Sequence, residues 1–346
     1  MHTKEKFHLT ARWMCFAVLL FATALRLAME PAVQEGLRSS AARLFSQERL
    51  HQAMLLFGAD VSGEESAKTP EQTSGAASPA KTYPDMLYTP SRRWTEQTSF
   101  TAEDAALVDI NNRAEAEFDA AELITRPLPF DASVEGPLVL IVHTHATEAY
   151  TPTAENDYDG DGSYHTRDVH YNVVRVGQAL ADTLNECGIE TINDETLNDD
   201  PSYNESYLRS AEVIERYLQE YPSIQMVIDL HRDAVEDSGG NQLAMTKELE
   251  GESYARLLLV MGTNVSGMYH PNWEDNLSCA LKVQALCEKR YAGLFRQMSL
   301  RSQRYNEHLT PCSMLLEVGT AGNTLEQAMR TARLFGRTLA ELLTAP

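Results

Sequence analysis

Basic residues are scarce in this chain. Its 346 residues include 29 Lys and Arg against 50 Asp and Glu, so the formal net charge is -21 at pH 7. A nucleic-acid-binding protein needs a basic face to meet the phosphate backbone, so this balance argues against that class. The length allows one large domain or two small ones.

Cysteine is also scarce, with five residues and no Cys-x-x-Cys pair. A zinc site built from cysteines is therefore not expected. The surroundings of these residues are apolar, which predicts buried free thiols at Cys15, Cys187, Cys279, Cys287 and Cys312. Their number and spacing leave the redox compartment open.

Three common catalytic motifs are missing from the sequence. No His-Glu-x-x-His occurs, so a helix-borne zinc protease site is excluded. No Gly-x-Ser-x-Gly and no convincing Ser/His/Asp set occurs, which argues against a serine hydrolase. No glycine-rich phosphate loop follows the apolar run at 137–142.

Residues 1–30 predict a short cytoplasmic tail followed by a transmembrane signal anchor. Lys4, Lys6 and Arg12 precede the stretch Trp13–Met29, which is apolar apart from Arg26 and near the ~17 residues needed to span a bilayer. The basic flank is expected to stay in the cytoplasm, which places the rest of the chain outside. A cleaved signal peptide, or an amphipathic helix continuing to residue 56, remains an alternative.

Residues 31–129 predict a linker region rather than a folded domain. Residues 31–57 carry apolar positions at helical spacing, which indicates a juxtamembrane helix. Residues 58–129 are expected to form a flexible linker and a transition with some helical character. Up to about residue 101 the linker is rich in Ser, Thr, Ala, Pro and Gly, a composition that buries too little apolar surface to fold.

Residues 130–346 have the regular pattern of a folded domain. Mainly apolar runs predict buried strands at 137–142, 224–230, 256–261 and 313–318, and shorter strands are expected at 189–192 and 298–303. Amphipathic spacing predicts helices at 172–187, 207–221, 272–291 and from 325 onward. This alternation predicts an α/β fold, with a mostly parallel twisted sheet covered by helices on both faces.

Two helix ends carry recognisable signals. Gly188 follows the helix expected at 172–187 and is a typical residue for the turn that stops a helix. Asn323 stands three residues before Glu326, which is the spacing of a capping box at the start of the last helix.

Polar residues gather where three of the predicted strands end. His143, His145 and Glu148 follow the first strand, His231 follows 224–230, and Glu317 lies in 313–318. In open α/β sheets, sites form outside the carboxyl ends of the strands. The sequence therefore predicts a functional site at this edge of the sheet.

Such a group of residues suits a metallohydrolase. Two or three imidazole or carboxylate ligands hold Zn²⁺ with an open position for water, whose pKa falls to about 7. A carboxylate that is not a ligand then moves the water's proton to the leaving amine. Glu317 is expected to serve in this role, because partial burial at the end of an apolar strand raises the pKa of a carboxyl.

Four blocks of sequence resemble the stage II sporulation protein P family of endospore-forming bacteria. They are HTHATEAY, TRDVHYNVVRVGQALADTLNECGI, VIDLHRDA and LLEVGTAGNTLEQAMRTARLFG, and they follow one another in order across residues 137–340. The resemblance implies a peptidoglycan hydrolase whose fold is related to the zinc-dependent N-acetylmuramoyl-L-alanine amidases. It further implies cleavage of the amide between muramic acid and L-alanine, and of a bond in the stem peptide. It also implies action during forespore engulfment, with stage II sporulation proteins D and M as partners.

Roles carried over from the amidases begin with three residues. His145 and His231 match the first and last zinc ligands, and Glu317 matches the catalytic Glu of an E-x-G pattern. The amidases have a Glu ligand at the start of the first helix, and this chain has none there. Asp168 is the preferred substitute for that ligand, and His170 is the alternative.

Other residues are expected near the same site. His143 shares strand parity with His145, so either could be the ligand if the chain stays extended. Glu148 is expected to contact the substrate or to orient a ligand as a second catalytic carboxylate. Arg232 and Asn323 are expected to bind the substrate, although Asn323 could serve only as a helix cap.

Two alternatives remain open at this stage. Asp157, Asp159, Asp161 and Asp168 have the spacing of a calcium loop but lack its final Glu, so a solvated acidic loop is the simpler interpretation. For function, a non-catalytic cell-wall-binding scaffold is the alternative to the amidase. A metallocarboxypeptidase or esterase with the same ligands is a third.

Overall fold

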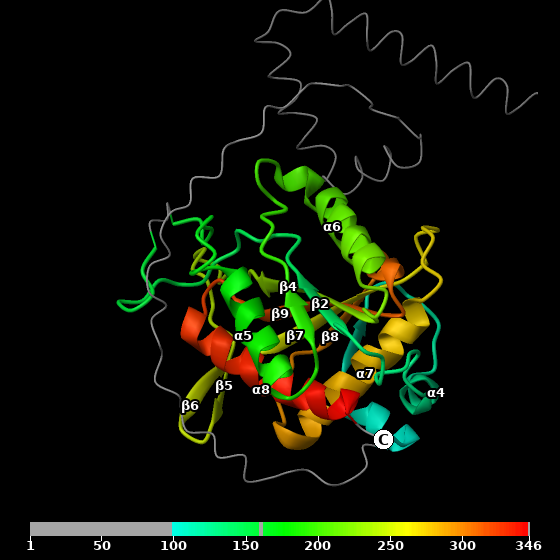
Figure 1. Cartoon of the computed structure of the whole chain (residues 1–346). Helices are drawn as coiled ribbons and strands as arrows, with labels where there is room; N and C mark the ends of the chain where they lie inside the picture. The colour runs from blue at the N-terminus through cyan, green and yellow to red at the C-terminus, as the bar shows by residue number, and fades with distance from the viewer. Residues whose placement is uncertain (1–98, 159–161, 345–346) are drawn as a thin grey trace, which may run out of the picture. The chain divides into compact units, whose positions relative to one another are not determined.

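The computed structural model describes residues 99–158 and 162–344 (Figure 1). Within these residues the main feature is a seven-stranded sheet in the order β1-β8-β7-β9-β4-β2-β3. The strands are β1 (Ile110–Asn112), β2 (Val139–Val142), β3 (Thr191–Asn193), β4 (Met226–Asp233), β7 (Leu257–Gly262), β8 (Met298–Arg301) and β9 (Cys312–Thr320).

The sheet is mostly parallel, as the sequence predicted, but it consists of two parallel groups that run in opposite directions. β3, β2, β4 and β9 form one group, and β7, β8 and β1 form the other. The groups meet at the antiparallel pair β7–β9. As a result, the carboxyl ends of β2, β4 and β9 lie at one edge of the sheet, and that of β7 lies at the opposite edge.

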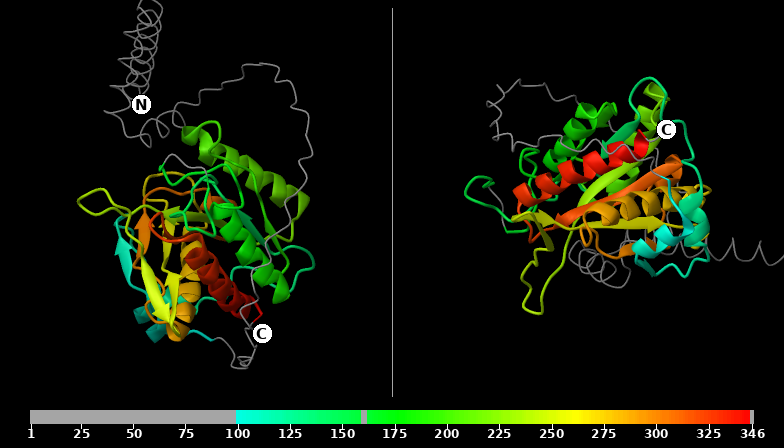
Figure 2. Two further views of the ribbon diagram at one scale, coloured as in Figure 1. Left: turned by 90° about the vertical axis from the view of Figure 1, so that its left-hand side faces the viewer. Right: turned by 90° about the horizontal axis from the view of Figure 1, so that it is seen from below.

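Helices cover both faces of the sheet, as Figures 1 and 2 show. On one face α5 packs against α8 and β4, while α7 packs against β7, β9 and α8. On the other face α6 packs against β2. The helices are α5 (Val173–Glu186), α6 (Ser206–Glu220), α7 (Trp273–Arg290) and α8 (Leu325–Leu343).

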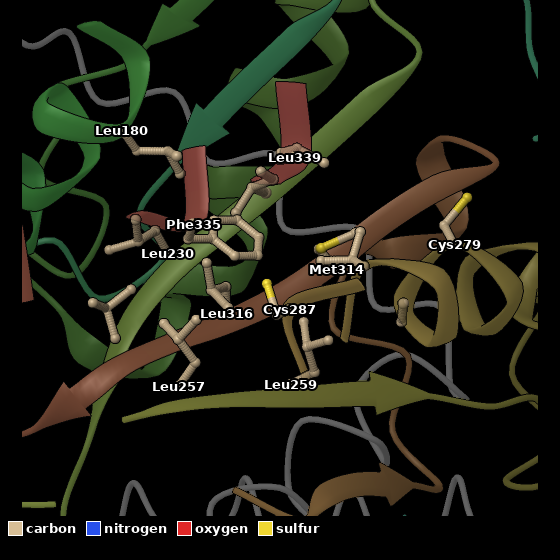
Figure 3. Packing of buried hydrophobic residues seen from close by; sticks show 14 of the residues in the cluster. Leu180, Leu230, Leu257, Leu259, Cys279, Cys287, Met314, Leu316, Phe335 and Leu339 are labelled. Carbon is tan, nitrogen blue, oxygen red and sulfur yellow. The ribbon is translucent and has the colours of Figure 1, made fainter. Parts of the chain in front are cut away.

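Alternation along β2 explains why it is apolar throughout. Val139 and Ile141 belong to the large core under α5, α7 and α8, whereas Leu140 and Val142 belong to the smaller core under α6. Successive strand residues point to opposite faces, so a strand covered on both sides needs no polar position. Figure 3 shows the large core, where Leu180 and Phe335 from the helices meet Leu230 and Leu316 from β4 and β9.

The segment that the sequence assigned to a transition, 102–130, contributes to this folded unit. It forms η1 (Ala102–Leu107), β1 and α4 (Ala120–Thr125). β1 pairs with β8, and α4 packs on α7, where Leu123 and Ile124 are buried. The short strand escaped sequence reasoning because Ile-Asn-Asn is mostly polar and too short to show a period. The same holds for the hairpin of β5 (Thr246–Leu249) and β6 (Glu252–Ala255).

The last helix begins one residue later than the capping pattern indicated. Thr324, not Asn323, is the N-cap, and its capping box is closed by Gln327 rather than Glu326. Asn323 with Glu326 and Thr324 with Gln327 both have the spacing of a capping box, so the sequence pattern alone could not choose between them. The stop after α5 is as expected, since Gly188 has a φ of +85°.

Three of the five cysteines, Cys279, Cys287 and Cys312, are buried free thiols, whereas Cys187 is exposed at the end of α5. Cys15 and the expected anchor at residues 13–29 lie outside the described residues. Within the described residues, no helix is both long and apolar enough to cross a membrane.

Candidate metal centre

The carboxyl ends of β2, β4 and β9 bring the predicted site residues to one place. β2 pairs with β4 in parallel, and β4 pairs with β9 so that His231 stands opposite Glu317. The imidazole rings of His145 and His231 meet edge to face, with centroids 5.0 Å apart. Segments separated by more than eighty residues in the chain therefore share one small volume.

A tight turn after β2 places His145 and Glu148 side by side. The strand ends at Val142, and the chain turns through residues 144–147, where the Glu148 N–H donates to the His145 carbonyl. Because of this turn, residues 145 and 148 lie next to each other, and their side chains project into the same space. Nδ1 of His145 lies 3.6 Å from Oε1 of Glu148.

Glu148 stands between the two histidines. Its other oxygen, Oε2, lies 3.5 Å from Nδ1 of His231. Within residues 99–158 and 162–344, His145, Glu148 and His231 form a buried group whose ligand atoms all lie within 4.8 Å of one another. Tetrahedral zinc, with bonds of about 2.0–2.2 Å, separates its ligand atoms by roughly 3.4 Å. Two imidazoles and a carboxylate with these separations fit a zinc ion.

Opposite charges attract one another within the group. Burial disfavours the imidazolium of His231, but Asp229 and Glu148 outweigh this effect and raise the pKa of His231 well above its usual value. Burial likewise disfavours the Glu148 carboxylate, but His145, His231 and Arg232 lower the pKa of Glu148 well below its usual value. The group is therefore stabilised by attraction between the His231 ring and the carboxylates of Asp229 and Glu148.

Asp229 supports His231 from behind. Its Oδ1 lies 2.9 Å from Nε2 of His231, although the N–H does not point straight at the oxygen. Asp229 also accepts hydrogen bonds from the backbone N–H and the hydroxyl of Thr144, at 2.8 and 2.6 Å. These contacts fix the carboxylate on the Nε2 side of the ring and leave Nδ1 facing Glu148.

Glu317 lies across from His231 on β9 and is not paired. Burial raises its pKa to about 8; His231 acts to lower it, and Glu148 and Asp233 act to raise it further. Its Oε2 is buried and has no hydrogen-bond partner in the described residues. A buried carboxyl oxygen without a protein partner is normally satisfied by a water, an ion or a substrate. It marks Glu317 as the free acid or base beside the ligand group.

Arg232 holds Glu148 and its loop in place. The Arg232 backbone N–H donates to Oε2 of Glu148 at 3.0 Å, and its guanidinium lies 3.7 Å from Oε1. The same guanidinium donates to the carbonyls of Ala149 and Tyr164. The side chain is buried. The structure therefore places Arg232 behind the site, where it positions Glu148.

Asp168 and His170 lie apart from the ligand group. Oδ1 of Asp168 accepts hydrogen bonds from the backbone and Nδ1 of His170, at 3.0 and 2.7 Å. Their side chains are 50% and 77% exposed. The structure thus gathers Glu148, and not the Asp168 expected from the resemblance, beside His145 and His231. The His-x-x-Glu spacing at 145–148 was the available sequence signal.

His143 points away from the site into the core. Its Nδ1 lies 2.9 Å from the Leu230 carbonyl, and its Nε2 lies 3.0 Å from Oδ1 of Asn193. Parity with His145 does not apply because the extended backbone ends at Val142. Full burial lowers the pKa of His143.

Asn323 is a buried structural residue. Its Oδ1 accepts hydrogen bonds from the N–H groups of Thr320 and Met245, at 2.9 and 3.2 Å. These contacts connect β9 to the loop before β5. The acidic loop is only partly described, since residues 159–161 lie outside the described residues.

Two residues at the site were missed by sequence reasoning. Asp229 lies inside an apolar strand, and its role depends on the ring that folds beside it. Tyr203 stacks on His145, with centroids 4.2 Å apart and planes at 19°. It belongs to a loop between β3 and α6, and no spacing relates it to the histidines.

Comparison with known proteins gives one curated relative and several solved structures. The chain is 30% identical over 220 residues to stage II sporulation protein P of Bacillus subtilis (strain 168), covering 59% of this chain and 51% of that protein. The chain thus spans about half the length of the curated relative it matches.

Two solved structures show low overall similarity. One is the N-acetylmuramoyl-L-alanine amidase AmiC2 of Nostoc punctiforme, with a TM-score of 0.34, 12% identity, and coverage of 60% of this chain and 93% of that one. The other is the CwlD amidase of Clostridioides difficile in complex with the GerS lipoprotein, with a TM-score of 0.35, 14% identity, and coverage of 60% and 95%.

The family model of stage II sporulation protein P matches residues 41–340. This range contains the ligand group, Glu317 and all seven strands of the sheet. Because the match extends over most of the sequence, the chain belongs to the stage II sporulation protein P family.

Proposed function

We propose that the protein is a metal-dependent peptidoglycan hydrolase that cleaves the amide between N-acetylmuramic acid and L-alanine. The observation that carries this proposal is the buried group of His145, Glu148 and His231, with the unpaired carboxyl of Glu317 beside it. Family membership supports the choice of peptidoglycan as the substrate.

His145, Glu148 and His231 would hold the metal, with zinc as the ion that their chemistry favours. When bound, zinc supplies a water of lowered pKa and polarises an amide carbonyl. The carboxylate of Asp229 holds the His231 ring so that Nδ1 stays available. Arg232 keeps Glu148 in position through its backbone N–H.

Glu317 moves the proton. It accepts a proton from the attacking water as the water's oxygen bonds to the carbonyl carbon, and it then gives that proton to the leaving nitrogen as the C–N bond breaks. The products are a lactyl carboxylic acid on the sugar and a free amine on the alanine. A metal ion held by the group would lower the pKa of Glu317 from about 8, because a nearby cation favours the carboxylate.

The setting follows from the family and the N-terminal sequence. We expect the protein to act outside the cytoplasm during forespore engulfment, anchored by residues 13–29, with stage II sporulation proteins D and M as partners. A second cut within the stem peptide would use the same residues, because both bonds are amides.

The experiment is digestion of purified sacculi followed by mass spectrometry of the released fragments. Wild type is expected to release stem peptides that begin with L-alanine, and Glu317→Gln to lose this activity while still binding one metal ion per chain. His231→Ala is expected to lose both the activity and the bound metal ion. A wild type that binds sacculi but holds no metal and cuts no bond would instead be a wall-binding scaffold.

The third ligand is tested by a pair of variants. Glu148→Gln is expected to lower metal content sharply, because it removes a charged ligand from the buried group. Asp168→Asn changes an exposed carboxylate that pairs with His170, and is expected to keep metal and activity. Loss of metal in Asp168→Asn but not in Glu148→Gln would show that Asp168 is the third metal ligand.

A further inference from the structure

Tyr203 is a half-exposed residue that packs on the ligand group. It begins η2 (Tyr203–Glu205), and its ring covers one face of the His145 imidazole. Its hydroxyl lies 3.5 Å from Nδ1 of His145, the same nitrogen that lies 3.6 Å from Glu148. The residue is nevertheless 52% exposed. Tyr203 therefore joins the ligand group to the space from which a substrate must arrive.

The loop that carries Tyr203 is held on both sides. Nδ2 of Asn198 donates to the His143 carbonyl at 3.0 Å, directly beside the site turn. Arg209 of α6 donates to the carbonyls of Asn198 and Ser202. The backbone that leads into Tyr203 is thus held both by the turn after β2 and by α6.

A phenol has an ordinary pKa of about 10, so Tyr203 offers a neutral O–H donor at neutral pH. The stacked ring and the 3.5 Å approach of the hydroxyl to Nδ1 of His145 place this donor beside the ligand group. Arg232, the cation next to Glu148, already donates to the carbonyls of Ala149 and Tyr164. A neutral hydroxyl is therefore the donor that faces the substrate.

We propose that the Tyr203 hydroxyl donates a hydrogen bond to the carbonyl oxygen of the scissile amide as that oxygen becomes an oxyanion. In the structure the hydroxyl lies within hydrogen-bond distance of His145 Nδ1. Once Nδ1 serves as a ligand, the hydroxyl needs another acceptor, and the amide oxygen arrives on the same side. Preorganised donors aimed at a developing charge stabilise the transition state more than the ground state. This inference rests on the proposed amide hydrolysis.

Tyr203→Phe in the full chain tests the donor while keeping the stacked ring. Removal of one oxyanion donor is expected to lower kcat by about 10²–10³-fold, with KM and metal content unchanged. A phosphinate analogue of the muramoyl–alanine link carries the oxyanion permanently. Isothermal titration is expected to show that Tyr203→Phe binds it about 10²-fold more weakly. Affinity for muramyl dipeptide, measured in a Glu317→Gln background, is expected to stay the same.

Tyr269→Phe is the matched control, since it makes the same chemical change at a side chain that is 74% exposed in the loop after β7. It should match wild type in every measurement. Wild-type kcat and phosphinate affinity in Tyr203→Phe would overturn the inference, as would a loss confined to metal content. Failure of the proposed function is seen separately, as a wild type that releases no stem peptide.

Discussion

At the scale of single residues, the behaviour of the site depends on side chains that would not bind the metal themselves. Asp229 contacts His231 and accepts two hydrogen bonds from Thr144, so it ties the middle of β4 to the turn after β2. Burial opposes its charge, but His231 and Thr144 lower the pKa of Asp229 below its usual value. It is therefore an anion that fixes which nitrogen of His231 faces Glu148.

Asp229→Asn tests this positioning role. Carboxylates that orient metal-bound histidines contribute about 10–100-fold in metal affinity, so the zinc Kd is expected to rise by that factor. Competition with a chelator of known affinity gives the Kd, and circular dichroism checks the fold. Asp182→Asn, on the exposed side of α5, serves as the control. An unchanged Kd in Asp229→Asn would show that His231 needs no such support.

At the scale of elements, α5 fits its neighbours because it has no side chain at residue 177. A Cβ at Gly177 would stand 2.4 Å from Oδ1 of Asn193 and 2.6 Å from the His143 ring. Those two side chains hydrogen-bond to each other just behind the site turn. The close approach of α5 therefore depends on glycine, although glycine weakens a helix.

Gly177→Ala is expected to destabilise the protein. In an unconstrained helix this change stabilises by about 1 kcal/mol, but overpacking a buried site costs about 1–3 kcal/mol. The buried His143 ring and the packed helix leave little room to adjust, so the cost of overpacking should exceed the gain in helix propensity. Urea unfolding measures the difference, with Gln178→Ala, one residue along, as the control. A higher midpoint for Gly177→Ala would contradict the packing described for α5.

At the scale of the whole molecule, a single folded unit lies downstream of a long N-terminal region. The described fold begins at residue 99, and its first elements, η1 and β1, already pack on α7 and β8. The segment Trp13–Met29 lies outside the described residues, and its role as an anchor stays a prediction from hydropathy and flanking charge.

Deletion of residues 1–30 tests the anchor. The full chain is expected to remain with membranes after washing with alkaline carbonate, whereas the deleted chain should appear in the soluble fraction. Immunoblotting of the two fractions measures the distribution. The zinc content of the soluble form shows whether the folded unit is intact. A full chain that the wash releases would mean that the segment does not span the bilayer.

Particular residues show how far sequence reasoning reached. The runs at 137–142, 224–230 and 313–318 appear as β2, β4 and β9, because a strand covered on both faces must be apolar throughout. The three-residue β1 and the single-residue shift of the last helix cap were beyond reach, since short elements and overlapping caps leave no distinct pattern. At the site, strand alternation suggested His143 as a possible metal ligand, but the extended backbone ends at Val142, so the alternation does not apply.

The sequence by itself determined the fold class and the edge of the sheet at which His145, His231 and Glu317 meet, because apolar periodicity and polar strand ends are local properties. Only the tertiary structure decided that Glu148 stands between the histidines, that Asp168 stays in solvent, and that Tyr203 covers His145. These choices depend on a turn, on strand register and on the approach of a distant loop. Each is set by packing between segments remote in the chain, which no local pattern encodes.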